Sequence, residues 1–433
     1  EVVLLLPDGL GFVAALFGAA RLGAIVVMAN PEAPGAELAA IVRYVEPRLV
    51  VGDSDLGVPQ VDEPELLAAD HRDAPALQGS DDDEVLWLLT SGSTGEPRAA
   101  VHRHRDFAEH ARLFGRAFLG IRADDVTYAV PRLHFPYATG MNLLYPFSVG
   151  AQVALVPARP SAADVYRDVA RVGATVLVTV PTIVAKMLAE EPAPSAVTTV
   201  RLATSAGEAL PPDLFVRFRA RHGVDLLDVL GSAEMFHVYV GNRPGDARPG
   251  SLGEAVPGYT LRVVRDDGNE AAPGETGLLW VRGPSAGLRY HRDPERSAAV
   301  FRPDGWVVTG DFVRREADGR YTYEGRADDM LKVSGLYVSP LEVEAVLRGH
   351  QAVEDCAVVG FDDEHGLCRP RAVLVLRGPA SPALLASLEA HARARLAGYK
   401  VPRAWDVVAT LPRNDRGKLV RRLLRGGRGK EGP

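Results

Sequence analysis

The stretch Val85-Leu-Trp-Leu-Leu-Thr-Ser-Gly-Ser-Thr-Gly-Glu-Pro-Arg98 joins an apolar run to a turn rich in glycine and hydroxyl residues. The apolar part, Val85 to Leu89, has the length and composition of a buried strand. Two glycines and four hydroxyl residues then occupy the six positions from Thr90 to Gly95. Glycine lets backbone N–H groups point at an anion, hydroxyl groups add donors, and Arg98 adds a fixed positive charge. The stretch therefore predicts a phosphate-binding loop.

Of two other interpretations of the same residues, the sequence leaves one open and excludes the other. A solvated Ser/Gly loop after a strand is the plain structural alternative, and composition by itself favours it. The usual P-loop is excluded, because no Gly-Lys-Ser/Thr follows at the required spacing.

The segment TSGSTGEPR resembles the phosphate-binding loop of the acyl-adenylate-forming superfamily, which includes acyl- and aryl-CoA ligases and peptide-synthetase adenylation domains. In that superfamily the loop continues with Pro-Lys-Gly, whereas this chain has Arg98 and Ala99 after the proline. The resemblance implies catalytic roles for Thr94 and Arg98. It also implies that the nucleotide is bound by Thr90, Ser91, Gly92, Ser93 and Gly95.

Composition limits the kind of protein. The 433 residues are enough for two or three domains with sizeable cores. The net charge of −7 argues against a nucleic-acid or anionic-membrane partner, and the most apolar window, residues 11–30, is too interrupted to span a membrane. Cys356 and Cys368 show no disulfide or metal pattern, so we expect a reducing, cytoplasmic location. Because the chain begins at Glu1 and enters a strand at once, we expect it to be a trimmed version of a longer protein.

Hydrophobic patterning predicts an α/β fold. A strand over residues 2–6, a helix over 11–22 and a strand over 24–28 form a βαβ unit, which is typical of a parallel sheet flanked by helices. Short β segments between residues 253 and 308 predict a small β-rich subdomain. Helices and strands beyond residue 328 predict a compact α+β module. The resemblance implies that this module is a mobile lid, with a large domain over residues 1–327 and a small one over 328–433.

An aromatic turn, Pro131-Arg-Leu-His-Phe-Pro-Tyr-Ala-Thr-Gly-Met-Asn142, precedes an apolar helix. Pattern alone favours a simple connector with core aromatic residues. In the superfamily this turn lies beside the acyl substrate, and here it matches the benzoate-CoA ligase branch. The resemblance thus implies that the acyl group is bound by His134, Phe135, Pro136 and Tyr137.

Two further segments, residues 200–211 and 228–234, resemble nucleotide- and acyl-binding segments of the superfamily, and a plain turn is the alternative for the first. The first implies roles for Ala206 in the acyl pocket and for Gly207, Glu208 and Ala209 near the adenine. The second implies adenine contacts from Asp228, Val229, Leu230 and Gly231. His237 follows the second segment, and it is either an acyl-pocket residue or a satisfied core histidine.

Glu234 occupies the position of the superfamily's Mg²⁺-binding glutamate. Mg²⁺ usually binds one or two carboxylates together with nucleotide phosphates, so a glutamate is chemically suitable. Ala233 replaces the superfamily threonine, which removes one hydroxyl donor. Without the resemblance, a lone loop glutamate would be interpreted as a surface residue.

The last motifs are Thr309-Gly-Asp311, Gly325-Arg-Ala-Asp328 and Pro412-x-x-x-x-Gly-Lys418. The resemblance implies that Asp311 binds the ribose diol, that Arg326 binds the ribose or phosphate, and that Asp328 is the hinge. Lys418 would bridge the acyl carboxylate and the α-phosphate. Each motif has a plain alternative as a charged turn or a solvated tail, and the order of the set is what favours function.

Together the motifs predict an ATP-dependent aryl-carboxylate–CoA ligase that uses ATP, Mg²⁺ and coenzyme A and acts through an acyl-AMP. The substrate would be a small aromatic acid such as a benzoate, a hydroxybenzoate or an aminobenzoate. One alternative is an adenylation enzyme that loads a separate carrier protein, and another is a non-catalytic binder of nucleotide or acyl-adenylate. Superfamily members are often homodimers, which the sequence neither requires nor excludes.

Overall fold

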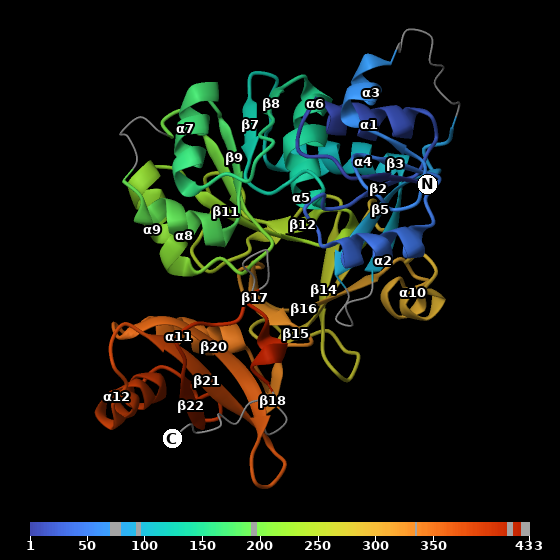
Figure 1. Ribbon diagram of the computed structural model, residues 1–433. Coiled ribbons are helices and arrows are strands. Elements are labelled where there is room, and N and C mark those ends of the chain that lie inside the picture. Colours follow the sequence, from blue (N-terminus) through green and yellow to red (C-terminus); the bar gives the residue numbers. More distant parts are fainter. Residues whose placement is uncertain (70–78, 92–96, 192–196, 334–335, 414–418, 426–433) are drawn as a thin grey trace. The chain divides into compact units, whose positions relative to one another are not determined.

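The computed structural model describes residues 1–69, 79–91, 97–191, 197–333, 336–413 and 419–425. By its internal contacts the chain divides into two compact units (Figure 1). The first unit comprises Glu1–Arg262 and Trp280–Thr309, and the second comprises Val263–Leu279 and Gly310–Pro433. The domain boundary expected at residue 328 remains a prediction.

A six-stranded sheet of order β4-β3-β1-β2-β5-β6 lies in the first unit. All its neighbouring strands are parallel except β5 and β6, which pair in antiparallel fashion. The predicted βαβ unit is confirmed, since helix α1 (Leu10–Arg21) connects β1 to its parallel neighbour β2. The strands are β1 (Val2–Leu4), β2 (Val26–Met28), β3 (Leu49–Val51), β4 (Gln60–Val61), β5 (Glu84–Ser91) and β6 (Pro97–Arg103).

Apolar side chains hold this sheet against its helices. The buried cluster includes Val3, Val27, Ile41 and Trp87, of which Ile41 comes from helix α2 (Gly35–Val45). The other helices of this part of the chain are α3 (Glu63–Ala68) and α4 (His104–His110).

The first unit also contains a seven-stranded sheet of order β13-β12-β11-β10-β9-β7-β8. Its strands from β8 to β11 are parallel, while β12 and β13 add antiparallel pairs at one edge. Helices α7 (Ala162–Val172), α8 (Pro181–Ala189) and α9 (Pro212–His222) lie beside it (Figure 1). The strands are β7 (Val126–Ala129), β8 (Gln152–Ala154), β9 (Val176–Thr179), β10 (Leu202–Ser205), β11 (Leu226–Gly231), β12 (Val238–Gly241) and β13 (Glu254–Ala255).

The helical stretch after β6 is divided in two. It starts as α4 and continues as a π-helix, η1 (Ala111–Phe118), where the Leu119 N–H bonds to the carbonyl of Phe114. Gly115 packs so closely on Tyr145 that an added Cβ would lie 2.8 Å from the Tyr145 Cβ. A second π-helix, η2 (Gly140–Leu144), lies between α5 (Pro136–Thr139) and α6 (Tyr145–Val149). Periodicity cannot distinguish these turns from an α-helix, because a π-bulge adds a single residue.

The predicted β-rich segments form a four-stranded sheet of order β14-β15-β16-β17. Strands β16 and β17 are antiparallel, and Asp311 pairs with Arg326. The strands are β14 (Thr260–Val264), β15 (Thr276–Arg282), β16 (Val307–Arg315) and β17 (Tyr321–Arg326), and helix α10 (Pro294–Val300) precedes β16.

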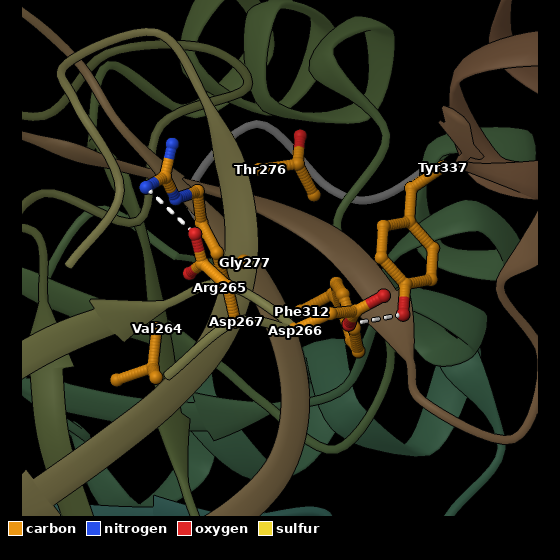
Figure 2. A pocket seen from close by; sticks show the side chains of 8 residues that line it. All are labelled: Val264, Arg265, Asp266, Asp267, Thr276, Gly277, Phe312 and Tyr337. Atoms are coloured by element: carbon orange, nitrogen blue, oxygen red, sulfur yellow. Dashed lines mark hydrogen bonds and ion pairs between the residues drawn. The ribbon is translucent and has the colours of Figure 1, made fainter. Parts of the chain in front are cut away.

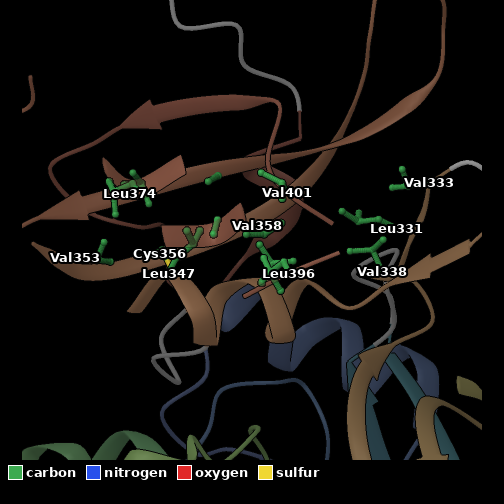
Figure 3. Close-up of a cluster of buried hydrophobic side chains, with 14 residues drawn as sticks. Leu331, Val333, Val338, Leu347, Val353, Cys356, Val358, Leu374, Leu396 and Val401 are labelled. Atoms are coloured by element: carbon green, nitrogen blue, oxygen red, sulfur yellow. The ribbon is translucent and has the colours of Figure 1, made fainter. Parts of the chain in front are cut away.

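The predicted C-terminal α+β module lies in the second unit. Strands β20 and β21 are antiparallel, and β22 adds a parallel edge. A buried cluster that includes Leu331, Leu347, Val358, Leu374 and Leu396 packs helices α11 and α12 against this sheet (Figure 3). The elements are β18 (Leu331–Val333), β19 (Leu336–Val338), α11 (Pro340–Arg348), β20 (Val353–Asp362), β21 (Cys368–Leu376), α12 (Pro382–Arg393) and β22 (Ala404–Val407).

Residues 419–425, which we call the tail segment, are bound to the same module. Arg421 at the start of the short helix η4 (Arg421–Leu423) donates to the buried carboxylate of Glu344 on α11. Arg371 on β21 donates to the Leu424 carbonyl. The Arg425 guanidinium donates to the Asp328 carbonyl and, at 2.8 Å, to Asp329 Oδ1. The tail segment is therefore tied both to the sheet and to the predicted hinge.

In the part of the chain that the structure describes, no helix is long and apolar enough to cross a membrane.

Candidate active site

The predicted phosphate loop connects two paired strands. Thr90 pairs with Arg98 and Ser91 with Pro97 across β5 and β6, and β5 confirms the strand predicted before the loop. The central loop residues Gly92, Ser93, Thr94 and Gly95 lie outside the described residues, so their roles remain predictions.

Arg98 lies beside two residues that the motifs did not indicate. Its guanidinium carbon is 5.3 Å from the centroid of the Tyr290 ring, and its Nε is 3.5 Å from Asp293 Oδ2. The Tyr290 hydroxyl donates to Glu234 Oε1 at 2.6 Å. Burial and the neighbouring Glu234 carboxylate raise the pKa of Tyr290, so its phenol stays protonated and remains a donor. Arg98, Tyr290 and Glu234 thus form one cluster at the base of the loop.

Backbone contacts fix the position of Glu234. It lies in the 3₁₀ turn η3 (Ala233–Met235) directly after β11. The Gly287 N–H donates to the Glu234 carbonyl at 2.8 Å, and His102 Nε2 lies 2.6 Å from the Ala233 carbonyl. Because these contacts hold the backbone on both sides, the Glu234 carboxylate is presented from a fixed turn.

A lone carboxylate fits Mg²⁺ only when the nucleotide supplies other ligands. Among the described residues there is no group of three or more His, Cys, Asp or Glu side chains that could hold a metal by itself. Glu234 offers hard carboxylate oxygens, and Mg²⁺ is commonly held by one or two carboxylates plus substrate phosphates and water. The residues present therefore fit a metal that arrives with ATP.

Two of the residues predicted to bind the acyl group, Tyr137 and His237, are in contact although they lie far apart in the chain. The Tyr137 hydroxyl on α5 lies 2.6 Å from Thr204 Oγ1 on β10, and His237 Nε2 lies 3.1 Å from the Tyr137 carbonyl. The rings of His134 and Phe135 are 4.2 Å apart. Burial lowers the pKa of His237 to about 4, so its imidazole is neutral near pH 7.

The connection between Glu234 and His237 has a strained backbone. Phe236 has φ of +68°, a region that bulky residues rarely occupy. Its buried ring packs against Phe107 and His102, which hold it in place. Strain of this kind persists only where surrounding structure enforces it, and it concentrates at functional sites.

Three buried polar atoms in these segments have no hydrogen-bond partner among the described residues: Ser205 Oγ, Ser232 Oγ and His237 Nδ1. Buried polar groups are almost always hydrogen-bonded, so each exception requires an explanation. Ser205 ends β10, Ser232 follows β11, and His237 follows the strained Phe236. A polar ligand in this region would satisfy them.

The predicted adenine-binding segments adjoin the carboxyl ends of two parallel strands. Ala206, Gly207, Glu208 and Ala209 follow β10, while Asp228, Val229, Leu230 and Gly231 belong to β11. Ser205 pairs with Asp228 across the two strands. Gly207 has φ of +84°, and a Cβ added there would meet no atom within 4 Å among the described residues beyond its chain neighbours, so the described part of the chain leaves space beside it. Thr182 Oγ1 donates to Glu208, and burial raises the pKa of Asp228.

Asp311, Arg326 and Asp328 lie in the second unit. Arg326 Nη1 donates to Asp311 Oδ1 at 3.0 Å, and the Tyr323 hydroxyl is 3.3 Å from the same oxygen. Asp328 lies in the turn that follows β17. Lys418 lies outside the described residues, and the flanking residues Pro412 and Val420 are joined by a backbone hydrogen bond of 2.9 Å.

A shallow pocket in the second unit contains none of the predicted site residues. It is lined by parts of β14, β15 and β16 together with Tyr337, whose hydroxyl donates to Asp266 Oδ1 at 2.7 Å (Figure 2). Arg265 and Asp267 on its rim form an exposed ion pair. Asp266 is already engaged by Lys332 and Tyr337, and Asp267 by Arg265, so we assign the pocket no role.

Sequence reasoning missed Tyr290 and Asp8. Tyr290 is 56 residues from its partner Glu234, and Asp8 is 125 residues from its partner Leu133. Neither belongs to a motif or to a periodic apolar pattern. We find no signal in a single sequence that could have indicated either contact.

The buried carboxyl group of Asp8 leads to a prediction about how stability depends on pH. Burial raises its pKa from 3.8 to about 6, against the opposing effects of Arg132 and of the Leu133 N–H. Because the pKa of Asp8 is higher in the folded than in the unfolded protein, the free energy of unfolding decreases as pH rises from about 4 to about 6. We expect the melting temperature of an Asp8→Asn protein, relative to wild type, to increase over that interval and then level off. The full shift corresponds to at most about 3 kcal/mol. Parallel thermal melts from pH 4 to pH 8 test this, and a constant difference would contradict it.

Comparison with known proteins identifies the family. The model of the family described as AMP-binding enzyme matches residues 1–291, and that of the AMP-binding enzyme C-terminal domain matches residues 342–418. A benzoate–CoA ligase of Thauera aromatica is 43% identical over 83% of this chain and 69% of its own length. A 4-hydroxybenzoate–CoA/benzoate–CoA ligase of Rhodopseudomonas palustris is 34% identical over 98% of this chain and 84% of its own.

A solved structure agrees in fold. The crystal structure of an anthranilate CoA ligase in complex with anthranoyl-AMP has a TM-score of 0.89 and 35% identity, covering 98% of this chain and 86% of that one. The predicted α/β fold class and the predicted superfamily are thereby confirmed. The chain belongs to the AMP-binding enzyme family.

Proposed function

We propose that this protein is an AMP-forming aryl-carboxylate–CoA ligase that activates a benzoate, a hydroxybenzoate or an aminobenzoate. The observation that supports the proposal is that one short segment, residues 231–237, contains both Glu234 and His237. Glu234 belongs, with Tyr290 and Arg98, to the cluster beside the predicted phosphate loop. His237 contacts the predicted acid-binding segment at Tyr137. One continuous backbone therefore serves both an anionic nucleotide and an aromatic acid.

The chemistry begins with a carboxylate, which is a poor acyl donor because its leaving group would be oxide. Attack of the carboxylate oxygen on the α-phosphorus of ATP forms an acyl–AMP bond and breaks the bond to pyrophosphate, which departs with its electron pair. Such a transfer depends mainly on in-line positioning and on neutralisation of charge.

This chain's residues would supply both requirements. Arg98 and the loop before it would hold the departing phosphates, and Lys418 would offset the repulsion between the carboxylate and the α-phosphate. Glu234 would hold Mg²⁺, which when bound offsets negative charge on the phosphates. Neutral His237, Tyr137 and Phe135 would orient the aromatic ring. In the second step the thiol of coenzyme A attacks the acyl carbon, AMP leaves, and the thiol proton passes to solvent.

Product analysis with the wild-type protein is the primary test. The protein is incubated with ATP, Mg²⁺ and a panel of aliphatic and aromatic acids, with and without coenzyme A, and the products are identified by mass spectrometry. We expect an aryl-AMP without coenzyme A and an aryl-CoA thioester with it. Adenylate without thioester would instead favour a carrier protein as acceptor, and the absence of both products would overturn the proposal.

Glu234 gives a prediction about the metal. In a Glu234→Gln protein the amide keeps an acceptor oxygen but loses the charge, so we expect the Mg²⁺ concentration for half-maximal ATP–pyrophosphate exchange to rise about tenfold. Tyr290→Phe removes the donor to Glu234 Oε1 and should cause a smaller change in the same direction.

Glu254, an exposed carboxylate that pairs with Arg243, provides the matched control. A Glu254→Gln protein should have the Mg²⁺ dependence of wild type. An unchanged Mg²⁺ dependence in Glu234→Gln would remove Glu234 from the metal site.

A further inference from the structure

Asp8 is a buried carboxylate that the mechanism does not use. It lies just after β1 in the six-stranded sheet and is 6% exposed. Its Oδ1 accepts a hydrogen bond of 3.0 Å from the Leu133 N–H and lies 3.5 Å from Arg132 Nη2. Leu133 belongs to the connection between β7 and α5, and β7 lies between β9 and β8 in the other large sheet. Asp8 therefore joins the end of a strand in one sheet to the turn that leaves the other.

The turn is held on both sides of Leu133. Its N–H is bound by Asp8, and its carbonyl accepts a hydrogen bond from the buried hydroxyl of Thr139. Thr139 Oγ1 also lies 3.1 Å from the Phe135 carbonyl. His134 and Phe135 follow directly, so the peptide groups that precede their side chains have little freedom to move.

Arg132 makes the turn depend on charge as well as on hydrogen bonding. Its guanidinium donates to three successive carbonyls after β8, those of Val156, Pro157 and Ala158. Carbonyls are neutral, so they satisfy the donors without balancing the charge. Asp8 supplies a counter-charge to this largely buried guanidinium. Loss of the carboxylate would leave both the cation and the Leu133 N–H without their partner, which a buried site tolerates poorly.

We propose that Asp8 is a positioning residue for the aromatic acid: through Leu133 and Arg132 it sets the place of His134 and Phe135 in the acyl pocket. This inference rests on the proposed function, in which residues 134–137 contact the acid. Tyr137, held by Thr204, anchors the far end of the same segment. Asp8 anchors the near end.

The test compares Michaelis constants in acid-dependent ATP–pyrophosphate exchange. In an Asp8→Ala protein we expect the KM for benzoate, or for the best acid of the panel, to rise about tenfold while kcat and the KM for ATP change less than about threefold. Asp8→Asn should give an intermediate KM, since its amide oxygen can still accept from the Leu133 N–H but no longer offers a counter-charge to Arg132. A residue that acts only through stability would not separate the two substrates.

Asp125 provides the matched control. It is 1% exposed and accepts from the Arg122 N–H at 2.8 Å, from Thr175 Oγ1 at 2.7 Å and from Arg201. It lies at the opposite end of β7 from the turn and contacts none of the predicted acid-binding residues in the described part of the chain. Asp125→Ala should lower stability without raising the KM for the acid.

Several results would overturn the positioning role. They are an unchanged KM for the acid in Asp8→Ala, an equal rise in both Michaelis constants, or an equal rise for the acid in Asp125→Ala. If Asp8→Ala does not fold, Thr139→Val replaces it, because it removes the other tie on Leu133 and should raise the same constant; no rise there would count equally against the role. A wild-type protein that shows no exchange with any aromatic acid would overturn the proposed function itself, whereas an active wild type with normal Asp8 variants would overturn only this inference.

Discussion

A Lys418→Ala protein is expected to form aryl-AMP at least about 10²-fold more slowly than wild type. The attacking carboxylate and the α-phosphate are both anions, and the lysine ammonium would offset their repulsion at the point where the new bond forms. Thioester formation from chemically supplied aryl-AMP should change little, because that step brings a thiol to a carbonyl. Acid-dependent ATP–pyrophosphate exchange measures the first step, and release of AMP from supplied aryl-AMP and coenzyme A measures the second.

Lys400 is the control for removal of a positive charge from the same module. Its ammonium pairs with Glu342 at 2.6 Å, so Lys400→Ala breaks an ion pair and leaves the motif at residues 412–418 intact. Its adenylation rate should stay close to that of wild type. A normal rate of adenylate formation in Lys418→Ala would show that the lysine assignment is wrong.

An Asp328→Pro protein is expected to separate the two half-reactions. Asp328 lies in a turn closed by a hydrogen bond of 2.9 Å from the Asp329 N–H to the Arg326 carbonyl. A hinge residue absorbs changes in φ and ψ, and proline fixes φ and also restricts the residue before it. Adenylation should stay within about threefold of wild type, while thioester formation from supplied aryl-AMP should fall about 10²-fold.

Ala317 offers a matched proline control. It lies in the exposed turn between β16 and β17, which is closed by a hydrogen bond of 3.0 Å from the Gly319 N–H to the Glu316 carbonyl. Ala317→Pro should leave both half-reactions unchanged. Equal losses in both half-reactions of Asp328→Pro would argue against a hinge and for general damage to the turn.

The sequence was sufficient for the parts of the fold that local patterns determine. The apolar run before Thr90 indicated a strand, and β5 lies where this pattern places it. Runs of Val and Leu indicated the parallel strands of the N-terminal sheet, because strands buried on both faces are apolar throughout. The π-helix η1 could not be predicted, because apolar periodicity does not distinguish a π-helical turn from an α-helical one.

The sequence predicted some residues of the candidate active site but not the contacts that hold them in place. Glu234 could be indicated from its motif, but the hydroxyl that holds it belongs to Tyr290, which lies in a polar segment without a pattern. For His237 the sequence left two interpretations open, and the structure contains elements of both. Its Nε2 is satisfied by the Tyr137 carbonyl as in a core histidine, while Nδ1 lacks a partner among the described residues as expected of a ligand-binding one. Such contacts depend on distant segments meeting in space.

The C-terminal sheet that holds the tail segment carries both cysteines of the chain, and their different burial allows a spectroscopic label to be placed selectively. Cys356 is fully buried and burial raises its pKa to about 12, so a thiol-reactive dye would leave it unmodified. Cys368 is partly accessible and lies on β21, the strand whose Arg371 donates to the Leu424 carbonyl of the tail segment. The sequence contains no third cysteine. A fluorophore attached to the native Cys368 would therefore report on the surroundings of β21, where Arg371 holds the tail segment, without engineering a labelling position.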